Sequence, residues 1–88
     1  PPIVLRNDGT ATAKTTVSLE ELSRNFPLNL GPDAEEHYRT LAVILSDKFG
    51  ETPSLGASWE GYGAKFTVAR LNGPAVELVE VQTMRDNS

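Results

Sequence analysis

His37 is the only histidine of the chain, and it lies between Glu36 and Tyr38. A histidine that acts as a general base needs a substrate or nucleophile within hydrogen-bond reach and a partner that fixes its tautomer. On a helix, its neighbours four residues away would be Asp33 and Leu41, one carboxylate and one apolar side chain. That pairing suits a local ion pair near a helix start as well as an acid–base site. We therefore predict a structural or solvent-exposed role for His37.

The catalytic alternative is a small hydrolase or nuclease-like enzyme in which His37 is the acid–base and Arg39 or Lys65 stabilises an anion. It requires a cleft in which His37 meets a second polar group. Neither Ser46 nor Ser58 lies in a nucleophile elbow, so a serine triad has no local support. We expect a protein that is not an enzyme, with no catalytic residue.

Metal and cofactor signatures are also incomplete. The chain contains no cysteine, which excludes a thiol nucleophile, a thiolate metal site and a disulfide framework. The acidic residues match neither an EF-hand loop nor a histidine–glutamate zinc motif. We expect no cofactor and no dedicated metal site, and a loosely held divalent ion on Asp33, Glu35 or Glu36 stays open.

Three glycines precede Lys65 in the segment 56–63. A phosphate-binding P-loop needs Gly-Lys-Ser/Thr leading into a helix, whereas here Ala64 separates Gly63 from Lys65 and a strand pattern follows. The glycines are better explained as positions that permit tight bends and close backbone approach around bulky rings.

The same segment holds the only tryptophan, Trp59, together with Tyr62, and Glu60 lies between them. Large amphipathic rings contribute strongly to contact energy at interfaces. A single tryptophan in a small domain is nevertheless usually buried in part. A core role and an interface role for Trp59 both stay open.

The charge distribution favours a basic partner. The net charge is −4, and residues 18–60 hold most of the acidic excess. That range contains three bases, Arg24, Arg39 and Lys48, against these acids: Glu20, Glu21, Asp33, Glu35, Glu36, Asp47, Glu51 and Glu60. Nucleic-acid binding draws most of its affinity from basic contacts, so we expect no nucleic acid as a partner. An acidic helical surface is, in most small proteins, merely solvated, and that alternative stays open.

The length of the chain limits the number of domains and the size of the core. A chain of 88 residues with 39% hydrophobic content suits a single domain over residues 1–88 with one small core. Stability from so small a core is marginal, so a homodimer is possible. No apolar run is long enough to span a bilayer, and we expect a soluble protein in the cytoplasm without membrane contact. The start at Pro1 without a methionine is compatible with a trimmed start, a removed leader or an excised domain.

Two hairpins must position these side chains. In the first, Ile3–Arg6 and Thr10–Val17 flank the turn residues Asn7, Asp8 and Gly9. In the second, Ala64–Leu71 and Ala75–Thr83 are joined by Asn72, Gly73 and Pro74. Along the last strand the apolar phase changes, which indicates either a β-bulge or burial of both faces.

Two helices lie between the hairpins. Ser18-Leu-Glu-Glu21 has the form of a capping box and predicts a short helix that ends before Pro27. Asp33 begins a second helix that we expect to run to about Phe49, with Gly50 as its stop. Its predicted apolar face contains Ala34, Tyr38, Leu41, Ala42, Leu45 and Phe49.

These elements predict an α+β domain of order β-β-α-α-β-β, with a mostly antiparallel four-stranded sheet packed on one long helix and one short helix. The ingredients for contact are present while those for catalysis are scarce. We therefore predict a non-enzymatic protein-interaction module, such as a small regulator, inhibitor or immunity-type protein, that binds a basic protein. The predicted contact residues are Glu35, Glu36, Trp59, Glu60 and Tyr62. The second alternative to this function is a self-assembling subunit of a homo-oligomer.

Overall fold

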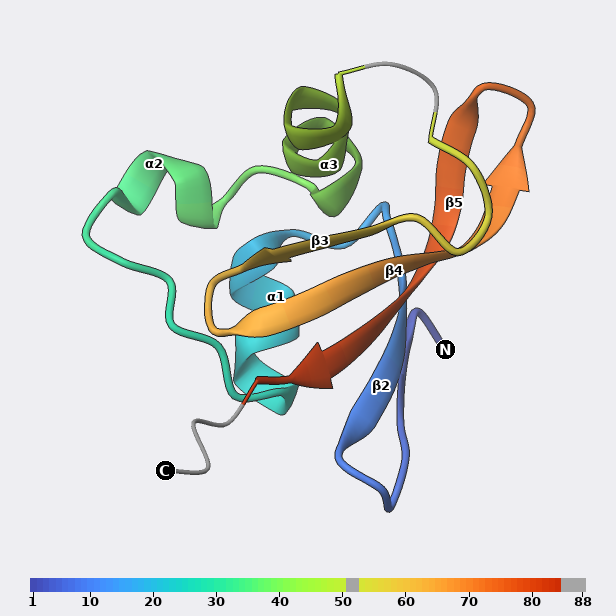
Figure 1. Cartoon of the computed structure of the whole chain (residues 1–88). Coiled ribbons are helices and arrows are strands. Elements are labelled where there is room, and N and C mark those ends of the chain that lie inside the picture. Colours follow the sequence, from blue (N-terminus) through green and yellow to red (C-terminus); the bar gives the residue numbers. More distant parts are fainter. Residues whose placement is uncertain (51–52, 85–88) are drawn as a thin grey trace.

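The computed structural model of the chain describes residues 1–50 and 53–84. Its order of elements is β1 (Ile3–Leu5), β2 (Thr10–Lys14), α1 (Leu19–Asn25), α2 (Ala34–His37), α3 (Leu41–Phe49), β3 (Ser58–Gly61), β4 (Ala64–Asn72) and β5 (Ala75–Thr83) (Figure 1). The strands form one antiparallel sheet in the order β1-β2-β5-β4-β3. The predicted α+β class is confirmed, but the sheet has five strands where we expected four. None of the helices in the described ranges is long and apolar enough to cross a membrane.

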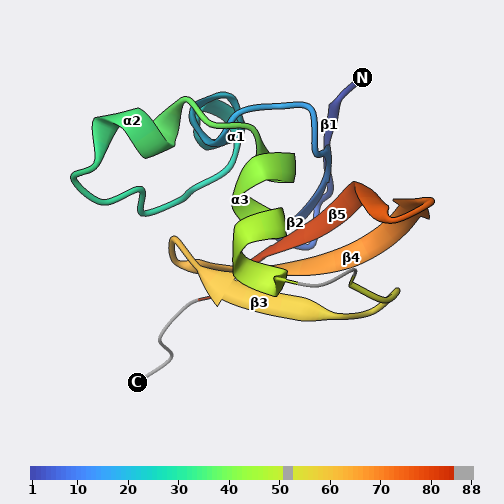
Figure 2. The same ribbon diagram turned by 90° about the horizontal axis from the view of Figure 1, so that it is seen from above.

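One face of the sheet carries the core. The curved sheet partly surrounds α3, and α1 lies on the same side (Figure 2). Because side chains alternate along a strand, every second residue points to this face. The core residues drawn from the strands are Ala11, Ala13, Ala64, Phe66, Val79 and Val81, and the helices add Leu19, Leu22, Leu41, Ile44 and Leu45. The opposite face is mostly polar.

Both predicted hairpins are confirmed. In the first turn Gly9 has a φ of +86°, and the Asp8 carboxylate accepts hydrogen bonds from the Thr10 backbone N–H at 3.1 Å and from its hydroxyl at 2.6 Å. In the second hairpin Asn72 pairs with Ala75. The turn residues, which can adopt conformations closed to most side chains, therefore locate both chain reversals.

A β-bulge lies in the second hairpin. Val68 pairs with Val79, whereas Arg70 pairs with Leu78, which leaves Ala69 of β4 without a partner across the ladder. Leu71 then pairs with Val76, which leaves Glu77 of β5 without one. An extra residue in one strand moves the alternation to the other face. Of the two explanations for the phase change in this hairpin, the bulge is confirmed.

The predicted short helix is also confirmed. Ser18 accepts a hydrogen bond from the Glu21 backbone at 3.1 Å, and the Glu21 carboxylate accepts one from the Ser18 backbone at 3.2 Å. This capping box starts α1, whose apolar stripe of Leu19, Leu22 and Phe26 is buried.

The single long helix predicted from Asp33 to Phe49 is wrong. The structure breaks it into α2 and α3, and Thr40 caps α3 by accepting a hydrogen bond from the Val43 backbone at 3.3 Å. A tertiary contact competes with the helix at the break, because Ser18 and Thr40 form an isolated antiparallel bridge. Side-chain periodicity carries no information about such a distant backbone partner.

The bridge uses backbone groups that a continuous helix would need. The Leu19 N–H donates to the Arg39 carbonyl at 3.0 Å, and the Leu41 N–H donates to the Val17 carbonyl at 2.8 Å. As a result Tyr38, which we placed on the apolar face, is 73% exposed. Ala34 and Ala42 are exposed as well, while the predicted burial of Leu41 and Leu45 is confirmed.

Candidate interaction surface

The aromatic residues of the predicted contact region form a cluster at the β3–β4 edge of the sheet. The Trp59 ring lies 5.6 Å from the Tyr62 ring in a T-shaped arrangement and 5.7 Å from the Phe66 ring, measured between centroids. Phe66 is fully buried, and Trp59 and Tyr62 are half-buried against the core. Trp59 therefore packs against the core, with part of its side chain left exposed.

Lys48 contributes the other side of this contact. It lies in the last turn of α3 and places its ammonium nitrogen 5.6 Å from the centre of the Trp59 ring. That separation falls within the range of cation–π attraction. No sequence pattern predicted this pair, since the two residues are eleven positions apart and on different elements. This contact connects α3, which carries Lys48, with β3, which carries Trp59.

Gly61 makes room for the Trp59 ring. Residues two apart on a strand point to the same face, and the ring lies flat over Gly61. A Cβ atom placed on Gly61 would overlap Cη2 and Cζ2 of the ring and would lie 2.8 Å from Cζ3. The predicted role of these glycines, close backbone approach around bulky rings, is confirmed at Gly61.

We expect Gly61→Ala to destabilise the domain by about 1 to 2 kcal/mol, because the added methyl forces the Trp59 ring from its place. Urea unfolding followed by Trp59 fluorescence measures both the stability and the altered ring environment. Ser58→Ala, an exposed position on the same strand, is the control and leaves stability within about 0.5 kcal/mol. Equal stability of Gly61→Ala and the wild type would show that the ring does not occupy this position.

The turn between β3 and β4 is strained at Tyr62. Gly61 pairs with Ala64, so Tyr62 and Gly63 alone form the turn, with φ of 57° and 73°. A positive φ is uncommon for a tyrosine, and such strain persists only where surrounding contacts maintain it. Here the Asn29 N–H donates to the Tyr62 carbonyl at 2.7 Å, and the ring packs on Trp59.

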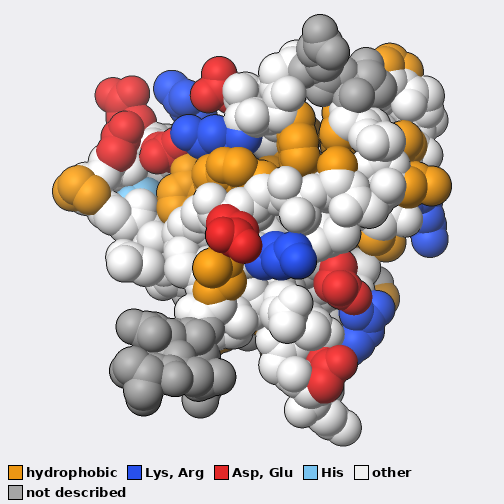
Figure 3. All heavy atoms as spheres, viewed as in Figure 1, with side chains coloured by type: hydrophobic (Ala, Val, Ile, Leu, Met, Phe, Trp, Pro, Cys, Tyr) orange, Lys and Arg blue, Asp and Glu red, His pale blue; other side chains and the backbone are white. Residues whose placement is uncertain are grey.

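The acidic residues Glu35 and Glu36 lie on α2, and Glu36 is close to the Tyr62 hydroxyl of this turn. Asp33 caps the helix by accepting a hydrogen bond from the Glu35 backbone at 3.1 Å. Burial raises the pKa of the Tyr62 hydroxyl, and the nearby carboxylate of Glu36 raises that pKa further. Figure 3 shows acidic side chains over α2, with basic side chains beside them. Glu35, Glu36, Tyr62 and the edge of Trp59 therefore share one region of the molecule.

Glu60 does not share that region. Trp59 pairs with Phe66 toward the core, and Glu60 pairs with Lys65 on the other face of the sheet. Because adjacent strand residues point to opposite faces, Glu60 and Trp59 diverge. The five predicted contact residues therefore divide into a group of four and an isolated fifth.

Of the groups named in the catalytic alternative, His37 and Lys65 lie apart. One ring nitrogen of His37, Nε2, is 3.0 Å from the Gly31 carbonyl, a contact that suits a structural role. Lys65 lies on the outer face of the sheet with Glu60, away from α2. Within residues 1–50 and 53–84, no three His, Cys, Asp or Glu side chains are grouped closely enough to hold a metal ion.

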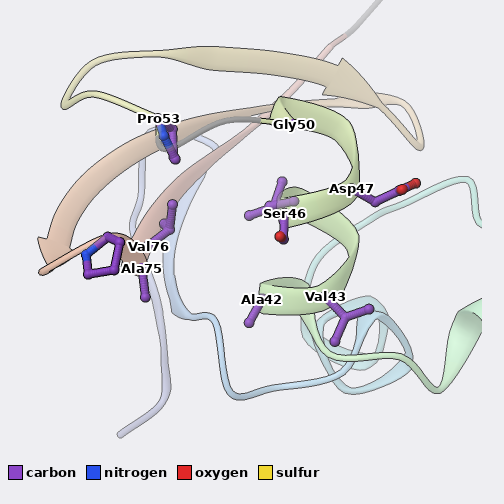
Figure 4. A pocket seen from close by; sticks show the side chains of 10 residues that line it. Ala42, Val43, Ser46, Asp47, Gly50, Pro53, Ala75 and Val76 are labelled. Carbon is purple, nitrogen blue, oxygen red and sulfur yellow. The ribbon is translucent and has the colours of Figure 1, made fainter.

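A hollow of about 810 Å³ lies between α3 and the start of β5. The side chains of Ala42 and Ser46 point toward Ala75 and Val76, and the Asp47 carboxylate points away (Figure 4). The described lining is mostly small and apolar, without the several convergent polar groups that usually orient a ligand. This hollow therefore adds no chemistry to the surface described above.

Comparison with known proteins places the fold in a family. Residues 5–85 match CorC_HlyC, the transporter associated domain. Among curated proteins, none matches this chain. A solved CorC_HlyC transporter associated domain from a Xylella fastidiosa Temecula1 hemolysin is 25% identical, with a TM-score of 0.78, and the match covers 97% of this chain and 98% of that one.

Two further structures agree. The same Xylella domain in complex with Mg²⁺ and Mn²⁺ is 26% identical, with a TM-score of 0.77 over 97% of this chain and 100% of that one. The CorC_HlyC domain from Nitrosomonas europaea is 22% identical and shares the fold, with a TM-score of 0.76 over 94% of this chain and 96% of that one. The family match extends over almost the whole chain, and the chain belongs to the CorC_HlyC family of transporter associated domains.

Proposed function

We propose that this domain is a non-enzymatic regulatory module of a transporter and that it binds a basic protein surface in the cytoplasm through α2 and the β3–β4 turn. The observation that carries the proposal is that α2 lies outside the core. This one-turn helix buries none of its residues, yet it carries Glu35 and Glu36, and Glu36 lies close to the half-buried Tyr62. Side chains that contribute nothing to the core are available for a partner.

The arrangement suits a charged contact with an aromatic centre. Glu35 is exposed and Glu36 is half-buried, so both carboxylates can approach lysine or arginine side chains. Tyr62 and Trp59 supply the rigid rings on which such contacts gain most of their energy. Opposite charges across an interface mainly raise the association rate and exclude wrong partners. The proposed partner is therefore recognised by charge and stabilised by contact with the rings.

The test is a binding measurement with the double variant Glu35→Gln/Glu36→Gln. A partner is first isolated from native lysate with the 88-residue chain as bait, then purified and titrated against each variant. We expect the double variant to bind about tenfold more weakly and to lose most of the salt dependence, because two attractive charges are removed. Circular dichroism establishes that the variant is folded.

The matched control is Asp47→Asn/Glu60→Gln, which removes the same charge from α3 and the outer sheet face. This control keeps wild-type affinity if α2 is the contact surface. Equal weakening by both double variants would show a general charge effect and contradict the proposal.

Because the Xylella domain was solved with Mg²⁺ and Mn²⁺, the titration is repeated with a chelator. Binding abolished by the chelator would replace the direct contact with an ion-bridged one.

A further inference from the structure

The strand β1 forms one edge of the sheet, and its outer side carries backbone groups that no strand of the described chain pairs with (Figure 1). The Lys14 N–H donates to the Pro2 carbonyl at 2.8 Å, and the Arg6 N–H donates to the Thr10 carbonyl at 2.9 Å. Even-numbered residues of this segment therefore bond toward β2. Because bonding directions alternate along a strand, the N–H and C=O groups of Ile3 and Leu5 point outward.

The side chains along this edge are apolar and exposed. Val4, on the outer face opposite Thr12, is 44% exposed, and Leu5, on the core face, is 53% exposed. Apolar edge strands attract other strands, and the short length of β1, three residues, limits how much contact its edge can make. Here apolar side chains flank free backbone groups on both faces of the strand.

A hollow of about 310 Å³ continues the edge on the core face. It lies between β1 and α1 and is lined by Pro2, Ile3, Leu5, Glu21, Arg24 and Asn25. A strand added to β1 would direct alternate side chains into this hollow. The residues near β1 line the hollow with apolar side chains, and α1 contributes the acid Glu21 and the base Arg24.

We infer that this edge binds a second copy of the chain, with the two β1 strands antiparallel and the two-fold axis at Val4. Ile3 then lies opposite the partner's Leu5, and each such pair exchanges both backbone hydrogen bonds. The two Val4 side chains meet at the axis on the outer face. The two sheets become one continuous sheet with every helix on the same face.

The segment favours its own copy because it is self-complementary. The two residues with outward backbone groups are symmetric about Val4, so the antiparallel register places apolar residues opposite each other at all three positions. Glu21 and Arg24 give the hollow one charge of each sign, so it has no excess charge of one sign to repel a second copy. Within the chain, Glu21 already accepts from the Ser18 backbone and Arg24 is paired with Glu20. Pro2 has no N–H, but the dimer loses no hydrogen bond at this position, because the backbone of Pro2 faces β2 and not the second copy. The short contact predicts a weak dimer that depends on concentration.

The test places a charged side chain at Val4, the residue on the proposed two-fold axis. Sedimentation equilibrium of the 88-residue chain, from micromolar to millimolar concentration, is expected to show a monomer–dimer equilibrium in the wild type. Val4→Lys and Val4→Glu are each expected to weaken dimerisation at least about tenfold, because like charges then face each other across adjacent strands. An equimolar mixture of the two variants regains dimer, since opposite charges now meet at the axis.

The control is Val43→Lys, which adds the same charge at an exposed valine on α3 and leaves the dimer intact. A wild type that stays monomeric at millimolar concentration overturns the inference, and so does a dimer that Val4→Lys leaves unchanged. The same holds if only an added peptide, and no second copy, occupies the edge. This surface is independent of α2, because β1 and β3 lie at opposite edges of the sheet, so either proposal can fail alone.

Discussion

Replacing Trp59 with alanine lowers the free energy of unfolding by about 3 kcal/mol, the range seen when a large ring is removed from a core. The ring contacts Tyr62 and Phe66, covers Gly61 and lies beneath the Lys48 ammonium group. Alanine removes all of these contacts at once and leaves a cavity on Phe66. Since the ring is half-buried, water fills part of that cavity, which keeps the loss below that of a fully enclosed tryptophan.

The measurement is urea unfolding followed by far-ultraviolet circular dichroism, because the variant lacks the only tryptophan and has no comparable fluorescence signal. The control is Glu60→Ala, the adjacent residue on the outer face, for which we expect a change within about 0.5 kcal/mol. A Trp59→Ala variant as stable as Glu60→Ala would mean that Trp59 serves a partner and not the core. The two single variants therefore resolve the alternatives that the sequence left open for Trp59.

Leu45→Ala is expected to lower the free energy of unfolding by about 3 kcal/mol, because a buried leucine loses its transfer energy and leaves a cavity. Leu45 lies in the middle of α3 and is fully buried with Leu41 in the core that faces the sheet. A short helix such as α3 gains most of its stability from the packing of one face. Loss of this side chain therefore weakens the attachment of the helix as well as the core.

Val43→Ala is the matched control, on the same helix but 53% exposed. Alanine is the better helix former, so the lost contact and the gained propensity offset each other, and we expect a change within about 0.5 kcal/mol. Thermal and urea unfolding of both variants provide the comparison. Equal destabilisation by the two variants would contradict the packing of α3 on the sheet through Leu41, Ile44 and Leu45.

Short sequence motifs correctly predicted the elements that depend on residues only a few positions apart. The capping box at Ser18 and the turn residues at Gly9 and Gly73 each satisfy or reverse the backbone within a few positions. Their outcome therefore depends little on distant residues. The same holds for the apolar pairs of the second hairpin, where coordinates were needed only to locate the register shifts at Ala69 and Glu77.

Partners distant in the chain decided the rest. The break after His37 follows from backbone bonds between residues near Ser18 and residues near Thr40, and no periodicity within 33–49 reveals a partner on another element. The sequence of residues 51–63 left an ordered loop and an irregular strand open, because the four residues of β3 include a glycine and lie in a glycine-rich segment. Pairing with β4 and the ring over Gly61 make it a strand.

The candidate surface divides in the same way. The sequence by itself determined which residues could make contact, because the chemistry of Glu35, Glu36, Trp59 and Tyr62 is a property of their types. Only the tertiary structure decided that these four lie together and that Glu60 points to the other face. The physical reason is that side-chain chemistry is local, whereas the direction of a side chain depends on strand register and on which backbone groups find distant partners.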